Sequence, residues 1–553
     1  MTMLDCVLVG FNDTSFPEYV DLVRAMGETS GAYRDLALAL VDVDGVPQRS
    51  MDLLNRYHFE GRPAERPFHN SDFLWPVITY LGTYLARRGF TFDYVNLFHQ
   101  EKERLRELLE SGDVLSVAIT TTLYVSPHPL IEVIRFVRDV NPDVKIVVGG
   151  PYVLNRTKML DTKALGELFS YLGADVYVIS SEGEAALVQV LEALKSGRRL
   201  DGIANIAYRE DGGFVSTPID PESNDLAENM VDYSLFPADE VRGFATIRTA
   251  RSCPFKCSFC GFPARAGAYV YLPVDLVAKE LDALAEAGVH TLTIIDDTFN
   301  VPKGRFKSIL RLMIERGYGF RWNSYLRSDH VDDETIELMH ESGCEGVFLG
   351  MESGSDVVLE AMNKTARRRH YAYVIPRLKD AGIVTHGSFI VGFPRESAET
   401  YAETNQFIEE VQPDFFRAQL WYCDLTTPVW AERERWGLTG AAFKWSHDTM
   451  DAATATDLVD RMFLDVENSI WLPQAGFELW SVYYLQRRGM SLPQIKTFLR
   501  AFNAAIQERM LLGTPSVAPD LLETLRRCSQ FDRGQPPSLD AIERVERYRA
   551  VAA

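Results

Sequence analysis

Three cysteines near the middle of the chain have the type and spacing of metal-cluster ligands. Cys253, Cys257 and Cys260 lie within residues 251–261, which read RSCPFKCSFCG. Three thiolates at this spacing can bind three corners of a cubane iron–sulfur cluster, [4Fe-4S], and leave the fourth iron without a protein ligand. Because an open iron can bind a substrate or a cofactor, the spacing predicts a catalytic cluster and not one that only carries electrons.

Two other interpretations of the three cysteines stay open. A structural zinc ion takes four ligands, often from paired C-x-x-C units. No fourth Cys or His lies close by in the sequence, and the next cysteine is Cys344. The three residues could also be unconnected cysteines of a hydrophobic core.

The C-x-x-x-C-x-x-C loop, with the aromatic Phe259 before its last cysteine, resembles the signature of the radical S-adenosylmethionine (SAM) superfamily. The resemblance implies that the open iron chelates the amino and carboxylate groups of SAM. It also implies that one electron from the cluster cleaves SAM to a 5′-deoxyadenosyl radical.

Length, charge and cysteine content limit the class of protein. A chain of 553 residues predicts three or four domains, and a net charge of −21 argues against a nucleic-acid partner. The N-terminus does not read as a secretion signal, and no apolar stretch is long enough to span a bilayer. Seven cysteines do not indicate a disulfide framework. Since an oxygen-sensitive cluster favours a reducing compartment, we expect a cytoplasmic protein that binds no membrane.

The first 200 residues alternate between strand and helix patterns. This order is typical of an α/β fold with a doubly wound, Rossmann-like parallel sheet, and a long insertion separates its first strand from its first helix, at about residues 11–74. The expected strands are residues 6–10, 91–97, 114–120, 145–148 and 176–179, and the expected helices are 77–88 and 129–140. Ligands of such sheets bind beyond the carboxyl ends of the strands.

The loops after these strands resemble those of the cobalamin-binding domain that precedes many radical SAM domains. Glycines after strands are weak evidence alone, because tight turns need them. The resemblance implies a cobalamin-binding domain over residues 1–200, with the cofactor held by Thr120, Thr121, Thr122, Gly149, Gly150, Pro151, Ser180, Glu182, Gly183 and Glu184.

The chain departs from many cobalamin proteins in one respect. It lacks the Asp-x-His-x-x-Gly motif whose histidine ligates cobalt from below; residues 10–14 read GFNDT. We therefore expect cobalamin in a base-off form with no histidine as lower ligand. The same absence leaves open a degenerate domain that binds nothing.

A second α/β series follows a polar connector at residues 201–240. We expect a partial, TIM-like (β/α)6 radical SAM barrel over residues 241–431, with reacting groups on the loops after its strands. Its expected strands are residues 245–250, 291–295, 321–326, 346–350, 385–392 and 415–421, and helical patterns at 274–287 and 305–316 lie between them. Residues 432–553 read as a helical domain without strands, with a break between helices near residues 489–493.

The loops of the expected barrel carry residues suited to SAM. A guanidinium pairs well with its carboxylate, which favours Arg327; Glu352 suits the ribose hydroxyls, and residues 390–392 suit the adenine. In relatives, the matching motif positions do these jobs. The cofactor-binding residues expected on these loops are Phe259, Asp296, Asp297, Arg327, Glu352, Ser353 and Gly392. The alternative for the carboxylates is a helix cap or a loop facing solvent; for Glu396 we expect a cap of the helix that begins near Ala398.

Six of the eight tryptophans lie between Trp421 and Trp480. They predict either a helical core or an aromatic lid that keeps water from radicals.

Together these features predict a cobalamin-dependent radical SAM methyltransferase. The resemblance implies that it acts on an unactivated carbon or phosphorus centre of a natural-product intermediate, through a 5′-deoxyadenosyl radical and methylcobalamin. Within this class the layout of the whole chain resembles the P-methyltransferases of phosphinothricin-type pathways, through residues 6–13, 81–85, 120–124 and 420–428. The expected partners are a small-molecule or carrier-bound substrate and an external flavodoxin- or ferredoxin-like electron donor.

Two alternative functions remain. A cobalamin-dependent radical SAM enzyme can catalyse a rearrangement, cyclisation or oxidation without transferring a methyl group, and the motifs do not distinguish this from methylation. A non-enzymatic cobalamin sensor with a structural metal would lack SAM cleavage, and the full barrel series after the cysteine loop argues against it.

Overall fold

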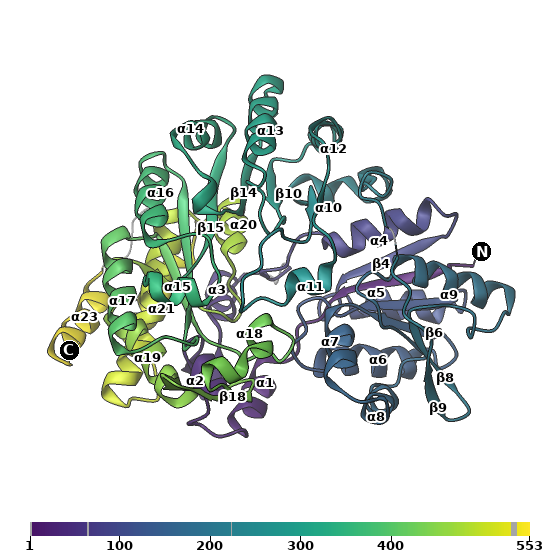
Figure 1. Cartoon of the computed structure of the whole chain (residues 1–553), viewed down its shortest axis with the longest axis horizontal. Coiled ribbons are helices and arrows are strands. Elements are labelled where there is room, and N and C mark those ends of the chain that lie inside the picture. The colour runs from purple at the N-terminus through teal and green to yellow at the C-terminus, as the bar shows by residue number, and fades with distance from the viewer. Residues whose placement is uncertain (1–2, 63–65, 223, 532–538, 553) are drawn as a thin grey trace.

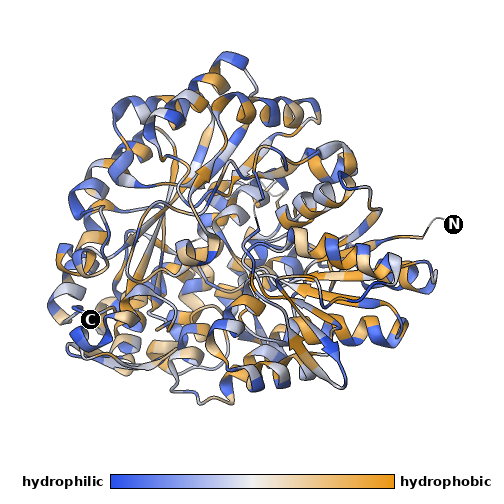
Figure 2. Ribbon diagram, turned by 45° about the vertical axis from the view of Figure 1, so that its right-hand side comes forward, coloured by the Kyte–Doolittle hydropathy of each residue, from blue (hydrophilic) through white to orange (hydrophobic). Residues whose placement is uncertain are grey.

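Two seven-stranded sheets organise the chain, and Figure 1 shows them in separate halves of the molecule. The computed structural model describes residues 3–62, 66–222, 224–531 and 539–552. In Figure 2 the strands of the N-terminal sheet are mostly hydrophobic. No helix in these ranges is long and apolar enough to cross a membrane.

The N-terminal sheet has the order β4-β1-β5-β6-β7-β8-β9. Its first five strands are parallel, and the last two are antiparallel. The strands are β1 (Cys6–Phe11), β4 (Phe92–Leu97), β5 (Ser116–Thr120), β6 (Lys145–Gly149), β7 (Val176–Val178), β8 (Ile206–Glu210) and β9 (Gly213–Ser216). The five predicted strands are confirmed. The expected connector at residues 201–240 also contributes β8 and β9 to this sheet.

Helices cover both faces of this sheet, so the doubly wound prediction is confirmed. Two helices pack on the face that shares the core of the second sheet, and four pack on the other face. The first pair is α4 (Pro76–Ala86) and α9 (Glu184–Ser196); the others are α5 (Lys102–Glu110), α6 (His128–Val140), α7 (Pro151–Met159) and α8 (Thr162–Leu172). The strand order reverses between β1 and β5, which is where such sheets bind ligands.

The second sheet is entirely parallel and open, with the order β10-β13-β14-β15-β16-β17-β21. All six predicted barrel strands are confirmed. They are β10 (Phe244–Ile247), β13 (Thr291–Ile294), β14 (Arg321–Tyr325), β15 (Cys344–Glu352), β16 (Val384–Val391) and β17 (Phe415–Leu420). The outer helices include α12 (Val274–Glu286), α13 (Lys303–Arg316), α14 (Asp333–Glu341), α16 (Arg368–Asp380) and α17 (Ala398–Val411).

The expectation of helices without strands after residue 432 was wrong. Three short strands form an antiparallel sheet, β18 (Thr439–Ala441), β19 (Lys444–His447) and β20 (Met450–Asp451), and β21 (Ile470–Trp471) joins the second sheet. Burial alternates along β19, which is a period-two pattern too short to stand out in the sequence. The helical part is otherwise as expected, with a break between α20 (Leu479–Arg487) and α21 (Leu492–Leu512).

The long insertion after β1 packs on the C-terminal part of the chain. Figure 1 shows its helices α1 (Phe16–Arg24) and α2 (Gly31–Ala37) beside α19 (Ala452–Asp465) and β18. Arg34 of α2 forms ion pairs with Asp457 at 2.6 Å and Asp460 at 2.5 Å. Arg509 donates to the carbonyl of Leu40 at 3.0 Å. The insertion therefore ties the N-terminal sheet to the open side of the second sheet.

Close packing behind β15 gives a test of this arrangement. A Cβ on Gly354 would lie 2.7 Å from the Thr404 Cα and from the Phe407 Cβ of α17. Gly354→Ala is expected to lower the free energy of unfolding by about 1–3 kcal/mol, because the backbone of α17 must shift. Gly304→Ala in α13 is the control, since its Cβ would meet nothing within 4 Å, and it should raise stability by up to about 1 kcal/mol. Equal urea midpoints for the two variants would contradict the packing.

Candidate active site

The cysteine loop follows β10 and is anchored at its start by a buried carboxylate. Asp296, after β13, accepts hydrogen bonds from the backbone N–H groups of Thr249 at 2.6 Å and Ala250 at 2.9 Å, and from the Thr249 hydroxyl at 2.5 Å. Burial raises the pKa of Asp296, and these bonds partly offset the rise. Because both carboxylate oxygens accept hydrogen bonds from Thr249 and Ala250, Asp296 positions the start of the loop.

The far side of the loop is held by segments after β15 and β17. The backbone N–H of Ser258 donates to the Met362 carbonyl at 2.9 Å, and its carbonyl accepts from the Val429 N–H at 2.9 Å. The Asn363 amide donates to the carbonyl of Lys256 at 2.6 Å. The backbone between the second and third cysteines is thus fixed from outside the loop.

All three thiols of the loop are free, and their surroundings suit thiolate ligands. Cys257 is buried, and Cys253 and Cys260 are half-buried. Burial raises the pKa of both half-buried thiols. The Arg327 guanidinium lowers the pKa of Cys253 and the Arg265 guanidinium lowers that of Cys260, although burial outweighs both effects. The cationic side chains of Arg327 and Lys364 also lie near Cys257.

The donor set fits a cubane cluster. Among the described residues, no three or more His, Cys, Asp or Glu side chains converge tightly enough to hold a single metal ion. In a cubane each thiolate binds a different iron, so three cluster ligands stand further apart than the ligands of one zinc ion. Three free thiols on one fixed loop, beside two cations, therefore match the predicted [4Fe-4S] ligands.

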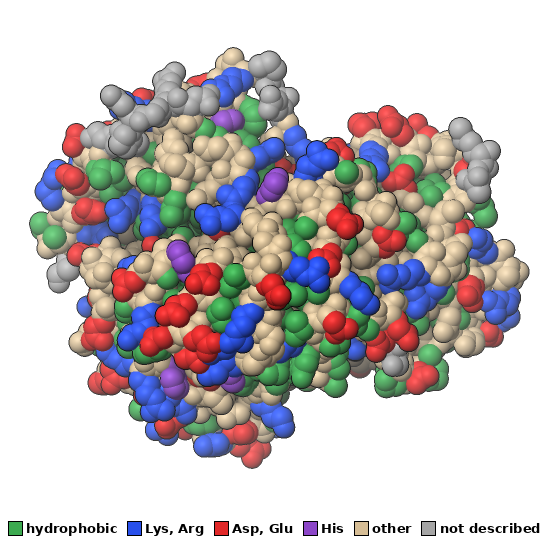
Figure 3. Space-filling model, turned by 90° about the horizontal axis from the view of Figure 1, so that it is seen from above, with side chains coloured by type: hydrophobic (Ala, Val, Ile, Leu, Met, Phe, Trp, Pro, Cys, Tyr) green, Lys and Arg blue, Asp and Glu red, His purple; other side chains and the backbone are tan. Residues whose placement is uncertain are grey.

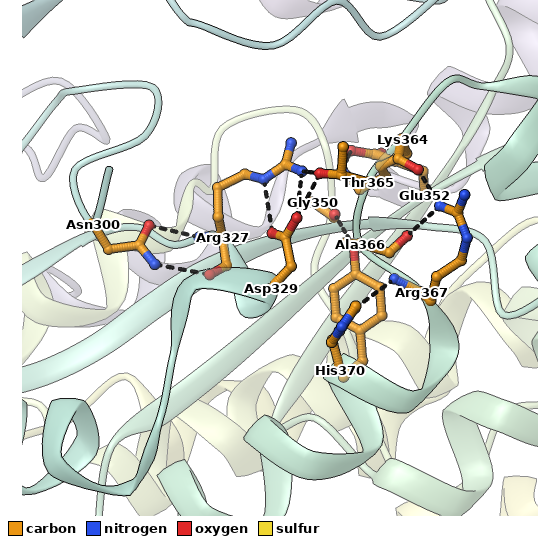
Figure 4. A network of polar contacts seen from close by, with 11 residues as sticks. Asn300, Arg327, Asp329, Gly350, Glu352, Lys364, Thr365, Ala366, Arg367 and His370 are labelled. Atoms are coloured by element: carbon orange, nitrogen blue, oxygen red, sulfur yellow. Dashed lines mark hydrogen bonds and ion pairs between the residues drawn. The ribbon is translucent and has the colours of Figure 1, made fainter. Parts of the chain in front are cut away.

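Arg327 is already paired in the structure. Its Nε and Nη2 atoms donate to the two carboxylate oxygens of Asp329 at 3.2 and 3.1 Å, and Nη2 also donates to Thr365 at 2.6 Å, as Figure 4 shows. Burial raises the pKa of Asp329, but Arg327 outweighs it and lowers that pKa to about 2. The guanidinium lies 3.7 Å from the ring centre of Phe255 in the cysteine loop. Arg327 thus braces the loop, and Asp329 occupies the Nε–Nη2 edge of its guanidinium.

Lys364 is the functional candidate that the sequence analysis missed. It is 5% exposed, its Nζ lies 3.2 Å from the Glu352 carboxylate (Figure 4), and it is 6.0 Å from the ring centre of Phe259. Burial lowers its pKa, but the neighbouring Tyr371 and Glu352 raise it overall, so the amine stays charged. Glu352 has a φ of 65° next to a register shift between β15 and β16, and such strain is common at functional sites. Nothing in the local sequence marks Lys364, because its contacts lie on other loops.

Two further predicted SAM contacts lie against the helices and the C-terminal segment. Ser353 is fully buried, and its hydroxyl lies 3.1 Å from that of Thr404 in α17. Gly392 has a φ of 96°, and an added Cβ would stand 2.5 Å from the Trp445 ring. Both positions therefore pack against neighbouring segments, and neither lines the large cavity at the edge of the N-terminal sheet.

The expected capping role of Glu396 was wrong. Ser397 caps α17 by accepting a hydrogen bond from the Thr400 N–H. Glu396 is buried instead, and its carboxylate accepts from the backbone N–H of Gly392. Burial raises the pKa of Glu396 to about 7.

A cavity of about 600 Å³ lies at the carboxyl edge of the N-terminal sheet. Nine of the ten residues predicted to bind cobalamin line it, together with Asp297. They are Thr120, Thr122, Gly149, Gly150, Pro151, Ser180, Glu182, Gly183 and Glu184. Thr121 is the exception, because its side chain turns away and donates to the Gly149 carbonyl at 2.8 Å. The strands supply an apolar wall that includes Leu8, Val9, Ile119, Val147 and Val178.

The second sheet forms the opposite wall of this cavity. Its contributions flank the cysteine loop and include Arg248, Arg251, Phe262, Arg265 and Asp297. Arg251 forms an ion pair with Glu182 at 2.9 Å, which links the two walls directly. Burial and the charge of Asp296 raise the pKa of Asp297 to about 7, although its carboxyl is exposed to the cavity. Figure 3, the view from above, shows acidic and basic side chains interspersed over the surface.

A smaller cavity of about 260 Å³ adjoins the first and shares Val77, Leu81 and Arg248 with it. Glu280 of α12 lines it and accepts a hydrogen bond from the Tyr233 hydroxyl at 3.1 Å. Burial raises the pKa of Glu280 to about 7.

A family model for the radical SAM superfamily matches residues 247–408. An uncharacterised methyltransferase of Pyrococcus horikoshii is 28% identical over 310 residues, which cover 55% of this chain and 65% of that protein. The anaerobic magnesium-protoporphyrin IX monomethyl ester cyclase of Rubrivivax gelatinosus is 27% identical over 368 residues, which cover 62% of this chain and 63% of the cyclase. The chain thus spans just under two thirds of the length of these curated relatives.

Solved structures resemble the whole chain. One is the radical SAM methyltransferase TsrM from Kitasatospora setae, solved with cobalamin and a [4Fe-4S] cluster, with a TM-score of 0.60, 15% identity and full coverage of both chains. Another is the cobalamin-dependent SAM radical enzyme OxsB with aqua-cobalamin, with a TM-score of 0.56 and 14% identity over 99% of this chain and 79% of that chain. At these identities the likeness shows a common fold, and it confirms the predicted fold class.

The buried carboxyl of Glu280 predicts a pH-dependent stability. The unfolded chain releases this proton near the ordinary pKa of 4.5 and the folded chain only near 7, so stability falls as pH rises between these values. Glu280→Gln is therefore expected to gain about 1–3 kcal/mol over the wild type between pH 5 and pH 8. Urea unfolding at both pH values measures this, with the exposed Glu286→Gln of the same helix as control. An equal effect of Glu280→Gln at both pH values would contradict the buried protonated carboxyl.

Proposed function

We propose that this chain, which carries a radical SAM domain over residues 247–408, is a cobalamin-dependent radical SAM methyltransferase. The observation that carries the proposal is the 600 Å³ cavity, which is lined on one side by the predicted cobalamin loops and on the other by residues that flank the cysteine loop. A methyl donor bound there would lie next to the radical source.

Different residues of and around the cysteine loop would bind the cluster and SAM. Cys253, Cys257 and Cys260 would ligate three irons, and Phe259 would pack beside SAM. We assign the SAM carboxylate to Lys364 in place of Arg327. Asp329 holds the Nε–Nη2 edge of Arg327, whereas the Lys364 ammonium bonds Glu352 through one of its three N–H groups and keeps two. When bound, the cluster supplies the electron that cleaves SAM, and cobalamin supplies the methyl group.

The N-terminal cavity suits a large ring with polar edges. Gly149 and Gly150 keep side chains away from its rim, and Gly150 has a φ of 105° that favours glycine. Thr120, Thr122 and Ser180 offer hydroxyl groups at the edge. No histidine is among the described residues that line the cavity, and we propose that cobalamin binds without a histidine as lower ligand.

The acceptor is proposed to be an unactivated carbon or phosphorus centre of a natural-product intermediate. The similarity to phosphinothricin-type P-methyltransferases does not distinguish a phosphorus acceptor from a carbon one. We further propose that the enzyme is cytoplasmic, that its substrate is a small molecule, free or carrier-bound, and that a flavodoxin- or ferredoxin-like protein supplies electrons.

A second candidate is a cobalamin-dependent radical SAM reaction without methyl transfer. The 27% identity to a cyclase over 62% of this chain favours it. The products separate the two. Methylation forms S-adenosylhomocysteine and 5′-deoxyadenosine together, whereas the second candidate forms 5′-deoxyadenosine alone.

Removing the three thiols tests the cluster assignment. The combined Cys253→Ala, Cys257→Ala and Cys260→Ala variant is expected to lose cluster iron and to form no 5′-deoxyadenosine from SAM, because no other ligand set replaces the loop. Iron analysis and product detection after anaerobic reconstitution measure both. Cys528→Ala, a buried cysteine outside the loop, should retain them. Deoxyadenosine formation by the triple variant would refute the assignment.

Filling the cavity tests cobalamin binding separately. Ser180→Trp places a large side chain in the cavity and is expected to weaken cobalamin binding at least tenfold, which corresponds to about 1.4 kcal/mol. Equilibrium dialysis measures the affinity, and iron content should be unchanged. Ser196→Trp, at an exposed site on α9, is the control. Wild-type affinity in Ser180→Trp would mean that cobalamin binds elsewhere or not at all.

A further inference from the structure

The inner side of the curved second sheet carries a row of polar and aromatic side chains. The ring of Phe348 lies between those of Tyr325 and His386. Its ring centre is 5.0 Å from that of Tyr325 and 4.7 Å from that of His386. Arg417 of β17 pairs in register with Ser388 of β16. Phe416, the neighbour of Arg417, points the other way and packs on Trp471, which in turn contacts Phe463 of the outer helix α19. Arg417 therefore faces the interior of the curved sheet.

Two of these interior groups lack hydrogen-bond partners within the described part of the chain. His386 is 1% exposed, and neither of its ring nitrogens has a partner. The buried Nε of Arg417 also has none. Leaving such a group unpaired destabilises the folded protein, so buried polar groups without partners indicate a missing ligand or water.

The charge of Arg417 is only partly compensated. Its Nη1 lies 3.6 Å from the Glu478 carboxylate, which is too far for a good hydrogen bond. Burial raises the pKa of Glu478, and it raises the pKa of Asp35 to about 7, although Arg417 opposes both shifts. Asp35 therefore carries less than its full negative charge near neutral pH.

Two cations beside the cysteine loop each pair with a carboxylate. Arg327 holds Asp329 at 3.1 Å, and Lys364 holds Glu352 at 3.2 Å. Arg417 differs from both, because in the described part of the chain no carboxylate lies within hydrogen-bonding distance of any atom of its guanidinium. A guanidinium fork matches a carboxylate or phosphinate group in size and geometry.

We propose that Arg417 binds an anionic group of the substrate, a carboxylate or a phosphinate, inside the curved second sheet, with His386 and Ser388 as further hydrogen-bonding groups. The proposal rests on the proposed function, because it names the substrate class of the same site. It places the bound anion in the interior of the sheet whose loops carry the cysteines.

Chemical modification of the wild-type holoenzyme tests the site without a turnover assay. The holoenzyme is labelled with phenylglyoxal in the presence of acetate, methylphosphinate or the uncharged acetamide. Mass spectrometry then measures the extent of labelling at each arginine. The anion of the right class should slow labelling of Arg417 at least threefold, and acetamide should not. Arg461, whose side chain is 70% exposed on α19, should label equally in all samples. Labelling of Arg417 that neither anion slows, or no labelling even without anion, would overturn the proposal.

A thermal-shift measurement provides the second test. The anion that protects Arg417 should raise the Tm of the wild type and of Arg461→Gln, and should leave that of Arg417→Gln unchanged, since a ligand stabilises only the protein that binds it. An equal rise in Arg417→Gln would overturn the proposal. Formation of 5′-deoxyadenosine by the wild type is measured separately. Its absence would refute the proposed function, while the labelling result would still decide the anion site.

Discussion

Hydrogen bonds from outside the cysteine loop fix the three thiols on which the site depends. Asp296 holds the backbone before the loop, and the Met362 carbonyl and the Val429 N–H hold Ser258 within it. Bonds to a charged group contribute about 1.5–3 kcal/mol each, and neutral ones about 1 kcal/mol. A loop fixed in this way presents three thiols and keeps its shape, so that one iron of a bound cubane can stay open to SAM.

The same loop is connected to the N-terminal sheet. Arg251, two residues before the first cysteine, pairs with Glu182 on the loop after β7. The insertion after β1 adds a second connection. Arg34 of α2 pairs with Asp457 and Asp460 of α19, and Arg509 of α21 donates to the Leu40 carbonyl. These contacts keep the two walls of the large cavity facing each other, which a reaction between two cofactors requires.

The sequence predicted the sheets and the cavity better than it predicted individual contacts. Strand position follows from hydrophobic periodicity and turn residues, and the carboxyl ends of parallel strands meet at one edge, so nine of the ten cobalamin-loop residues line one cavity. The prediction that Thr121 lines the cavity was wrong, because successive side chains of an extended segment point to opposite sides and those of Thr120 and Thr122 face the cavity. Arg327 and Lys364 could not be assigned from sequence, because a cation's availability depends on which carboxylate the fold brings to it. The C-terminal strands were missed because each has only two to four residues.

The central claim is that one iron of a cubane lacks a protein ligand and binds SAM. Electron–nuclear double resonance on the reduced, reconstituted protein tests it most directly, with SAM labelled with 15N at the amino group and 17O at the carboxylate. The account predicts hyperfine coupling from both labels to the cluster. A reduced cubane that shows coupling to neither label, with a fourth ligand supplied by the protein, would contradict it.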